Sequence, residues 1–300
     1  MKDAYTDIET KKSIKYNYLQ MILLNLGGNM VSYDIRKLQL VQLEMLKDID
    51  KICKENGIQY YIFYGTLLGA IRHEGFIPWD DDIDIGMLHN DFIKFNKLCE
   101  KKLPEKYFLQ NEKTDKNFPR MWSKIRINNT CNMEREYRRL KVHYGIDMDI
   151  FDIIYLSDNL VFRNVQKACA YIYRLLMFEK AHNAIDDEFK RSRDTKIYKI
   201  LPGFLKSWLL KLSKKITYCT ASKKSNYVMD VSEILIMDSD IFEKTKMLKF
   251  EDEEFFAPYK SEKFLEEYYG DYMTLPPENE RTGHGDRIVD FENSYEKYTL

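Results

Sequence analysis

The chain has 300 residues and a formal net charge of −1; 44% of its residues are hydrophobic and 32% are charged. This composition is typical of a soluble globular protein and excludes a disordered chain. No run of about eighteen apolar residues occurs, and the N-terminal residues lack the apolar stretch of a secretion signal. We therefore expect a cytoplasmic protein without a membrane-spanning helix.

The near-neutral total hides a basic segment at 190–224 and an acidic one at 238–280. The basic segment contains aromatic residues, but no nucleic-acid-binding motif accompanies it, so we expect no nucleic acid among the partners. The five cysteines are odd in number and form no CxxC pair, which indicates neither a disulfide framework nor a zinc site.

The first predicted element is an amphipathic helix, because apolar residues recur every three to five positions from Asp34 to Asn56. Aromatic and β-branched residues then predict a buried strand over 58–64. A tight turn at Gly65-Thr66 leads into one or two helical turns over 67–75. The order is therefore helix, strand, turn and short helix.

Two later segments alternate aspartate with apolar residues, which is typical of strands. In "DIDIGM" (82–87) the alternation places Asp82 and Asp84 on one face of a strand. In "IDMDIFDIIYL" (146–156) it does the same for Asp147 and Asp149. Between them we predict a helix over 90–103 and a strand over 120–129, with Lys124 and Arg126 on a common face.

Beyond residue 160 the pattern becomes helical, with helices predicted over 164–184 and 202–216. We accordingly predict an α+β fold with a mixed-sheet core and a helical extension. The predicted divisions are a catalytic core over 1–157, a basic helical region over 158–237 that faces a membrane or the acceptor, and a segment over 238–300 that packs back on the core.

The carboxylates on each strand lie close enough to repel one another, so burying them requires protonation, pairing or a cation. Oxygen ligands without histidine or cysteine favour Mg²⁺ or Mn²⁺ over zinc, and Mg²⁺ shares its coordination with substrate phosphates. The run "DDDID" (80–84) taken alone also fits a solvated acidic loop. Its apolar neighbours Phe76, Ile77 and Trp79 favour a buried metal site.

Other residues near the aspartates are candidates for binding phosphate. Gly65 and Thr66 offer backbone N–H groups and a hydroxyl to an anion at a helix N-terminus, although an ordinary turn is equally compatible with them. Lys124 and Arg126 could clamp phosphates or be surface cations. Arg72 could face a phosphate and His73 could aid proton transfer, unless both cap the end of a helix.

The stretch "FYGTLLGAIRHEGFIPWDDDIDIGM" (63–87) resembles the signature of the LicD family of phosphotransferases, which includes the fukutin-related ribitol-phosphate transferases. Further similar segments occur in the family's order: residues 38–66 upstream, "GIDMDIF" (145–151) and "YYGDYMTLPPENERTGH" (268–284). The resemblance implies a nucleotidyltransferase-like core. It covers residues 38–284, with 155–240 matching least.

The family's metal ligands match Asp82 and Asp84, and its third carboxylate best matches Asp149, with Asp147 as the alternative. Arg281 and His284 match the family's basic C-terminal segment. The resemblance also implies transfer of a phosphorylated small alcohol, often phosphocholine, from a cytidine diphosphate donor to a sugar hydroxyl on a surface glycan or its lipid-linked precursor. CMP would be released.

We expect Asp82 and Asp84 to hold Mg²⁺ or Mn²⁺ against the donor diphosphate, and Asp149 to bind metal or take the proton. Three alternatives remain: transfer of ribitol, glycerol or aminoethyl phosphate or phosphonate; a nucleotidyltransferase that releases pyrophosphate; and a noncatalytic binding module. The intact aspartates argue against the last.

Two further features bear on the partners. Aromatic rings bind quaternary ammonium groups such as choline, and Tyr61, Trp79 and Trp122 are candidates, although rings beside an active site are commonly core residues. The helix over 202–216 places Leu205, Trp208, Leu209 and Leu212 on one face. That helix could lie on a membrane surface or pack in the core.

Overall fold

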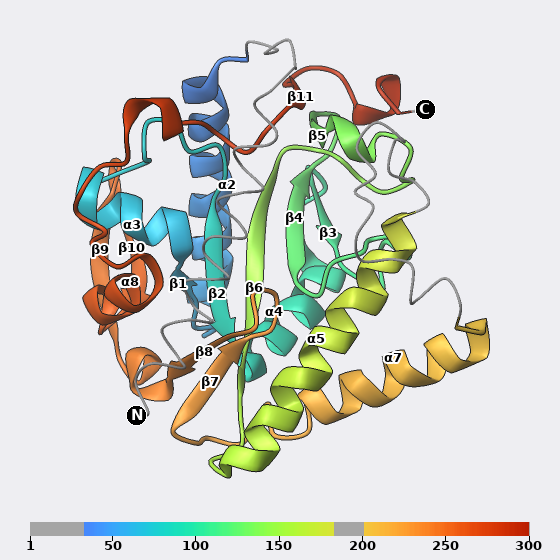
Figure 1. The fold of residues 1–300 in the computed structure, drawn as a ribbon. Helices are drawn as coiled ribbons and strands as arrows, with labels where there is room; N and C mark the ends of the chain where they lie inside the picture. The colour runs from blue at the N-terminus through green and yellow to red at the C-terminus, as the bar shows by residue number, and fades with distance from the viewer. Residues whose placement is uncertain (1–32, 183–200, 300) are drawn as a thin grey trace.

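The computed structural model describes residues 33–182 and 201–299, which form a mixed α/β fold (Figure 1). Six α-helices and eleven strands fall within these ranges. The expected α+β class is therefore confirmed. Residues 183 and 184 of the helix predicted over 164–184 lie outside the described residues.

Seven of the described strands form the central sheet, in which β6 (Asp147–Tyr155) is the central member. Along one side β6 pairs in parallel with β2 (Asp84–Leu88). Along the other side it pairs antiparallel, first with β4 and then with β7. The remaining bounds are β1 Tyr61–Ile62 beside β2, β3 Tyr107–Gln110 beside β4 Ser123–Ile127, and β8 Leu235–Asp238 beside β7 Tyr227–Asp230.

Helix α2 (Ile35–Glu55) lies against one face of this sheet (Figure 1). It begins where the Asp34 carboxylate accepts a hydrogen bond from the backbone N–H of Lys37, a typical N-cap contact. Its apolar face includes Leu46 and Ile49, neither of which has exposed surface. Each fully buried side chain of this kind contributes about 1.5–3 kcal/mol, so α2 forms a large part of the core.

The other described elements surround the sheet. Helix α4 (His89–Lys102) follows β2 directly. Helices α5 (Leu160–His182) and α7 (Gly203–Thr217) pack on each other at one side of the molecule (Figure 1). The remaining elements are α3 Tyr64–His73, β5 Cys131–Glu134, the hairpin β9 Thr245–Phe250 with β10 Glu253–Pro258, α8 Ser261–Tyr269, and β11 Arg287–Asp290, which pairs with β5.

The structure differs from the sequence prediction around the first strand. Only Tyr61 and Ile62 are in a strand, and α3 begins at Tyr64, whose φ is +39°. Gly65 and Thr66 therefore lie in the first helical turn and not in a turn before the helix. The strand is short because only Tyr61 and Ile62 pair with β2, its only partner in the described residues.

Two other expectations are corrected. Asp82 precedes β2, so it lies in the loop that enters the strand and not on the strand itself. Residues 227–238 form β7 and β8, which extend the central sheet, whereas this part of the chain was expected to be helical. The divisions at 157 and 237 stay predictions. Among the described helices, none combines the length and apolar character needed to cross a bilayer.

Candidate active site

Helix α2 holds both acidic segments in place through buried glutamines. The side-chain amide of Gln42 donates to the carbonyl oxygens of Asp81 (3.1 Å) and Asp147 (3.0 Å). Gln39 donates in the same way to the carbonyls of Ile77 and Asp80. The two aspartate-rich segments, far apart in sequence, are therefore fixed to one helix and to each other.

Asp84 on β2 and Asp149 on β6 are direct neighbours in the parallel strand register. Burial, together with the charges of Asp82 and Asp149, raises the pKa of Asp84 well above its usual value. Burial also raises the pKa of Asp149, and the charges of Asp147 and Asp82 add to this despite Lys124. The structure thus brings together the three carboxylates predicted from the sequence, and leaves them short of positive charge.

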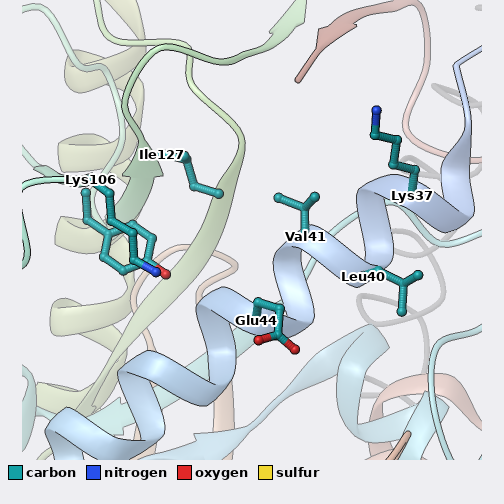
Figure 2. A pocket seen from close by; sticks show the side chains of 7 residues that line it. Lys37, Leu40, Val41, Glu44, Lys106 and Ile127 are labelled. Carbon is teal, nitrogen blue, oxygen red and sulfur yellow. The ribbon is translucent and has the colours of Figure 1, made fainter. Parts of the chain in front are cut away.

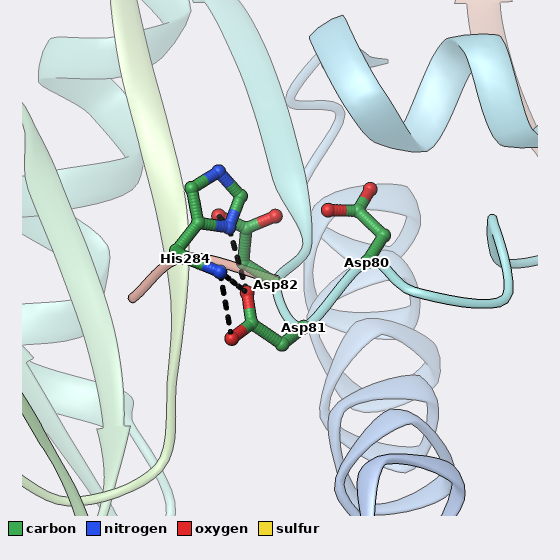
Figure 3. Close-up of side chains that lie close together, drawn as sticks. All are labelled: Asp80, Asp81, Asp82 and His284. Atoms are coloured by element: carbon green, nitrogen blue, oxygen red, sulfur yellow. Dashed lines mark hydrogen bonds and ion pairs between the residues drawn. The ribbon is translucent and has the colours of Figure 1, made fainter. Parts of the chain in front are cut away.

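Asp82 also belongs to a second group of side chains, which Figure 3 shows. Asp80, Asp81, Asp82 and His284 each offer one ligand atom, and these atoms lie within 4.8 Å of one another. Burial and the Asp82 charge raise the pKa of Asp80 well above its usual value. Asp80 therefore adds a further crowded carboxyl group, whereas Asp82 lies 3.5 Å from Nδ1 of His284.

Asp81 differs from the other aspartates because the protein neutralises it. Its carboxylate accepts a hydrogen bond from the Tyr33 hydroxyl (2.6 Å), lies 2.6 Å from Nδ1 of His284, and lies 3.7 Å from Nε of Arg287. Burial alone would raise the pKa of Asp81, but Arg287, His284 and Tyr33 together hold it below its usual range. Asp81 thus ties the C-terminal segment to the acidic run.

His284 itself is half exposed, with 55% of its side-chain surface open to solvent. The charge of Asp82 and the contact with Asp81 raise the pKa of His284 well above its usual value. The imidazole is therefore positively charged near pH 7. It lies at the exposed edge of the acidic group.

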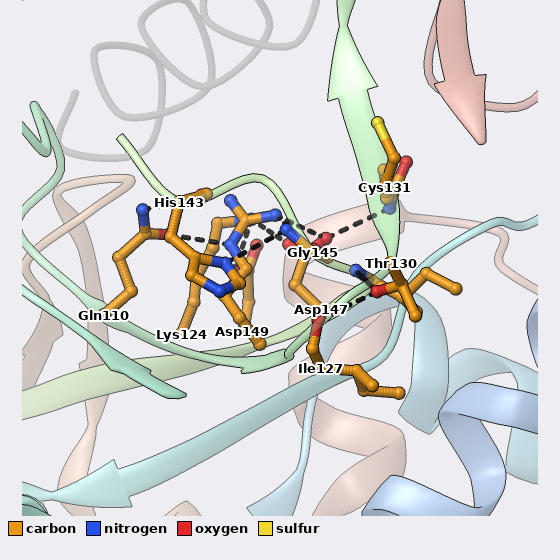
Figure 4. Close-up of polar contacts among 12 residues, drawn as sticks. Gln110, Lys124, Ile127, Thr130, Cys131, His143, Gly145, Asp147 and Asp149 are labelled. Carbon is orange, nitrogen blue, oxygen red and sulfur yellow. Dashed lines mark hydrogen bonds and ion pairs between the residues drawn. The ribbon is translucent and has the colours of Figure 1, made fainter. Parts of the chain in front are cut away.

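Lys124 and Arg126 lie on a common face of β4, as the sequence predicted, and both contact carboxylates. Figure 4 shows Lys124 with Asp147 and Asp149. Lys124 Nζ lies 2.6 Å from Asp147 and 2.7 Å from Asp149, and Arg126 lies 2.9 Å from Asp147. Although burial opposes it, Arg126 and Lys124 hold the pKa of Asp147 below its usual value. Asp147 is thus paired, which favours Asp149 as the third carboxylate.

The start of α3 supports the acidic run. The Thr66 hydroxyl accepts a hydrogen bond from the backbone N–H of Asp84 (2.8 Å), so it fixes the first residue of β2. A Cβ atom on Gly65 would lie 2.6 Å from a carboxylate oxygen of Asp80. Both residues therefore contact the acidic segment, and their predicted contact with substrate stays a prediction.

A further cluster next to Asp80 consists of Arg72, His73, Trp79 and Arg281. Arg281 lies over the Trp79 ring at 5.4 Å, and the His73 ring meets the Trp79 ring edge-on at 6.2 Å. Arg72 donates to the carbonyl oxygen of Tyr272 (2.8 Å). Burial and the Arg72 charge lower the pKa of His73, so its imidazole is neutral near pH 7.

The other two aromatic candidates lie in different surroundings. Tyr61 is buried in the core, and its hydroxyl donates to the carbonyl of Phe242. Trp122 packs beside Phe151 and under the guanidinium of Arg120. Tyr61 is therefore a core residue, whereas Trp122 is only partly buried and contacts the Arg120 guanidinium.

A separate open groove of about 390 Å³ lies between α2 and the ends of β3 and β4 (Figure 2). It is lined by Lys37, Leu40, Val41, Glu44, Lys106, Tyr107 and Ile127. None of these residues belongs to the acidic site, so this groove is not the candidate active site.

Sequence reasoning missed several residues that the structure places at the site. Asp80 and Asp81 belong to the run "DDDID", but strand alternation drew attention only to Asp82 and Asp84. Arg287 and Tyr33 carry no local signal, because their contacts with Asp81 span long stretches of chain. Gln42 is detectable only as a polar residue on the buried face of α2.

The donor atoms at the site suit a hard divalent cation. Asp82, Asp84 and Asp149 supply only carboxylate oxygens, which Mg²⁺ and Mn²⁺ prefer. The pKa values of Asp84 and Asp149 are raised by burial and by their like-charged neighbours, so a bound cation would relieve their repulsion. The predicted metal ligands therefore fit such an ion.

Comparison with known proteins identifies relatives. Residues 57–155 match the domain family described as LicD/FKTN/FKRP, nucleotidyltransferase domain. The chain is 28% identical over 268 residues to the lipopolysaccharide cholinephosphotransferase LicD of Haemophilus influenzae, covering 83% of this chain and 95% of that protein. It is 49% identical over 35 residues to the ribitol 5-phosphate transferase FKRP of Homo sapiens, covering 12% of this chain and 7% of that protein.

The fold, the acidic site and these relatives together define a transferase of substituted phosphate groups. Residues 57–155 match the LicD domain family, and most of the chain is similar to a LicD cholinephosphotransferase. The resemblance predicted from the sequence is thereby confirmed.

Proposed function

We propose that the protein transfers a phosphorylated small alcohol, with phosphocholine as the first choice, from a CDP-linked donor to a sugar hydroxyl of a cell-surface glycan or its lipid-linked precursor. The observation that carries the proposal is the pairing of Asp84 and Asp149 on neighbouring parallel strands, with Asp82 beside them. The name of the Haemophilus influenzae relative supports phosphocholine, and that of the human relative supports ribitol phosphate as an alternative.

Asp82, Asp84 and Asp149 would hold Mg²⁺ or Mn²⁺, which supplies charge neutralisation for a donor diphosphate when bound. The protein's own cations flank these carboxylates. His284 lies next to Asp81 and Asp82, and Lys124 bridges Asp147 and Asp149. Arg72 and Arg281 lie near Trp79, where we place further contacts with the donor.

A proton must leave the acceptor hydroxyl as it attacks the phosphorus atom. We assign its removal to Asp149 or to His73. The lowered pKa of His73 keeps its imidazole neutral and able to accept a proton near pH 7. Asp149 lies beside Asp84, so it is nearer the site where we place the donor phosphates.

The description of the matched domain favours a second candidate reaction, in which a nucleotidyltransferase-like core attacks the α-phosphate of CTP or ATP and releases pyrophosphate. We place both reactions at the same carboxylates, and their products differ. CMP is released by transfer from a CDP-linked donor, whereas pyrophosphate is released by nucleotidyl transfer.

The test is release of CMP or pyrophosphate by the purified protein with Mg²⁺ and CDP-choline, CDP-ethanolamine, CDP-ribitol, CDP-glycerol or CTP. We expect CMP from one CDP-linked donor, its loss in EDTA, and a rate about a thousandfold lower for Asp82→Asn, because one metal ligand is removed. Asp240→Asn is the matched control, since Asp240 pairs with Lys260 outside the acidic site.

A loss of only about tenfold in Asp82→Asn would contradict the role of Asp82. Pyrophosphate release from CTP without CMP release would favour the second reaction. If no product forms, donor binding is measured directly, because an absent acceptor conceals turnover. Failure to bind any of the CDP-linked donors would overturn the proposed transferase.

We also propose peripheral contact of α7 with a membrane surface, where a lipid-linked acceptor would be found. Phe204 and Trp208 lie one helical turn apart with 78% and 56% of their surfaces exposed, and Leu212 continues this face. Lys211 and Lys215 are exposed on the same side. Aromatic and basic residues on one helix face favour binding to an anionic bilayer.

A further inference from the structure

Arg120 is a charged residue beside the candidate active site to which no role has been assigned. Its guanidinium carbon lies over three aromatic rings, at 4.8 Å from Phe178, 5.1 Å from Trp122 and 5.7 Å from Tyr137. Within residues 33–182 and 201–299 it makes no hydrogen bond and no ion pair. Aromatic rings attract the guanidinium through cation–π contacts, but they offer its N–H donors no oxygen acceptor.

Arg120 lines a cavity of about 50 Å³ together with three other cations, Lys124, Arg126 and Arg287. Two carboxylates, Asp147 and Glu134, lie in the same lining, which therefore holds more cations than carboxylates. Asp149 and Asp81, outside the lining, pair with Lys124 and Arg287. A cavity of this size has room for several water-sized groups, and hence for the oxygens of a phosphoryl group.

The other cations of the cavity already have partners. Lys124 bridges Asp147 and Asp149, and Arg126 donates to Gln110 and to the carbonyl of Gly145. Arg287 donates to the carbonyl of His284 and toward Asn132. Among the described residues that line the cavity, Arg120 is therefore the cation whose donors are not already used.

The indole N–H of Trp122 gives a second sign of missing acceptors. It is buried and makes no hydrogen bond to any described residue, and its ring lies against the Arg120 guanidinium. Buried donors in native proteins nearly always have an acceptor. Trp122 does not line the cavity itself, so this unpaired donor marks a shortage of acceptors next to Arg120.

We propose that this cavity is an anion subsite in which Arg120 binds phosphoryl oxygens of a substrate. The proposal rests on the proposed function, because Lys124 links the cavity to Asp149 and thus to the carboxylates assigned to phosphate transfer. The phosphate belongs either to the donor diphosphate or to a phosphorylated acceptor. Arg120 is a binding residue, and its guanidinium suits paired contacts with two phosphate oxygens.

The test is isothermal titration of the full-length protein in Mg²⁺ with CDP-choline, CMP and pyrophosphate. Arg120→Met keeps the apolar stem but removes the donors, and Arg120→Lys keeps the charge but removes the planar fork. We expect Arg120→Met to weaken the binding of CDP-choline or of pyrophosphate at least about tenfold. Arg120→Lys should weaken the binding of the same ligand less. The matched control is Arg163→Met. Arg163, on α5, also lies over an aromatic ring, that of Tyr227, but it is outside the cavity.

The ligands distinguish the source of the phosphate. Loss of CDP-choline binding with CMP unchanged assigns the cavity to the donor phosphate that carries the alcohol, and loss of both assigns it to the phosphate next to the nucleoside. Loss of pyrophosphate binding alone assigns it to a phosphorylated acceptor. Arg120→Lys gives the answer if Arg120→Met does not fold.

Two further outcomes separate this inference from the proposed function. If the wild-type protein binds CDP-choline and both Arg120 variants bind it and pyrophosphate within twofold, the subsite is overturned while the donor assignment stands. If the wild-type protein binds pyrophosphate through Arg120 but none of the CDP-linked donors, the subsite stands and the donor assignment is overturned. Binding of neither ligand overturns both.

Discussion

His143 is held in its neutral form because both of its ring nitrogens are committed. Nδ1 accepts a hydrogen bond from the backbone N–H of Gly145 (3.1 Å), so Nε2 carries the proton and lies 3.0 Å from the Asn128 side-chain oxygen. The ring also stacks on Phe108. Burial and the nearby Arg126 charge lower the pKa of His143 from 6.5 to about 3.

This residue makes the stability of the protein depend on pH. Between pH 6.5 and 3 the unfolded chain takes up a proton on this histidine and the folded chain does not. Stability is therefore lost as the pH falls below 6.5, by about 2 kcal/mol between pH 7 and pH 5. We expect His143→Gln to remove about this much of the pH dependence.

Urea unfolding of both proteins at pH 7 and pH 5 measures the effect. The interval from pH 7 to pH 8 serves as the internal control. Over that interval the free energy of unfolding should change equally little in the wild type and in His143→Gln. An identical loss of stability in both proteins on going to pH 5 would contradict the neutral assignment.

At the site, the sequence predicted those residues whose positions follow from strand periodicity. Alternation placed Asp149 on the face that meets Asp84, and the parallel register confirms that they are neighbours. Periodicity could not predict that Asp81 is neutralised, because Tyr33 and Arg287 approach it from distant parts of the chain. Nor could it separate Asp147 from Asp149, because the difference lies in their contacts with Lys124 and Arg126.

At the scale of single elements, α3 packs unusually close to the segment that leads into the acidic run. A Cβ atom on Gly69 would lie 2.4 Å from the carbonyl oxygen of Gly75 and 3.3 Å from the backbone nitrogen of Ile77. These are backbone atoms, so they cannot move aside as a flexible side chain can. The closeness of α3 to this segment therefore depends on a glycine at position 69.

We expect Gly69→Ala to destabilise the protein by about 1–3 kcal/mol, because the added methyl group forces helix and loop apart. It should also lower activity, since the displaced segment leads into Asp80, whose backbone N–H donates to the carbonyl of Ile77. Gly203→Ala is the matched control: Gly203 begins α7 with no atom within 4 Å of an added Cβ, and its substitution should change stability by less than about 0.5 kcal/mol. Equal stability of the two variants in urea unfolding would contradict this account.

Long periodic elements were predicted well and short ones poorly. The helix expected over 34–56 and the strand expected over 146–156 correspond closely to α2 and β6, because each has a continuous buried face. The strand expected over 58–64 shrank to two residues, since its length is set by pairing with β2 and not by its own composition. Where the local sequence pattern was ambiguous, tertiary contacts thus determined the length of the strand.

At the scale of the whole molecule, the pair α5 and α7 leaves apolar surface exposed. The lysines of α7 fall into two groups, one in ion pairs and one exposed to solvent. Lys206 and Lys214 pair with Glu179 and Glu112, whereas Lys211 and Lys215 are exposed beside Trp208. The sequence placed the apolar residues on one face, but Leu205 and Leu209 are only partly exposed and Phe204 is the most exposed of them.

We expect the protein to co-sediment with vesicles that contain phosphatidylglycerol and much less with vesicles of phosphatidylcholine alone. Replacing Lys211 and Lys215 by glutamate should weaken binding at least about tenfold, because each lysine contributes about 1 kcal/mol near an anionic surface. Trp208→Ser should weaken it as well. The control is Tyr259→Ser, an exposed aromatic residue outside the two helices; equal binding by all variants would contradict membrane contact through α7.

The link between Asp81 and His284 has a consequence for how the protein is made. The two residues are 203 positions apart, so a ribosome has built the acidic run and both of its strands long before the histidine and Arg287 exist. Folding during synthesis begins from the N-terminal side. In a growing chain the aspartates therefore lack the positive charges of His284 and Arg287 until these residues have been synthesised. Assembly of the acidic site is therefore a late event in biosynthesis, and an unfinished chain lacks the charge balance of the completed site.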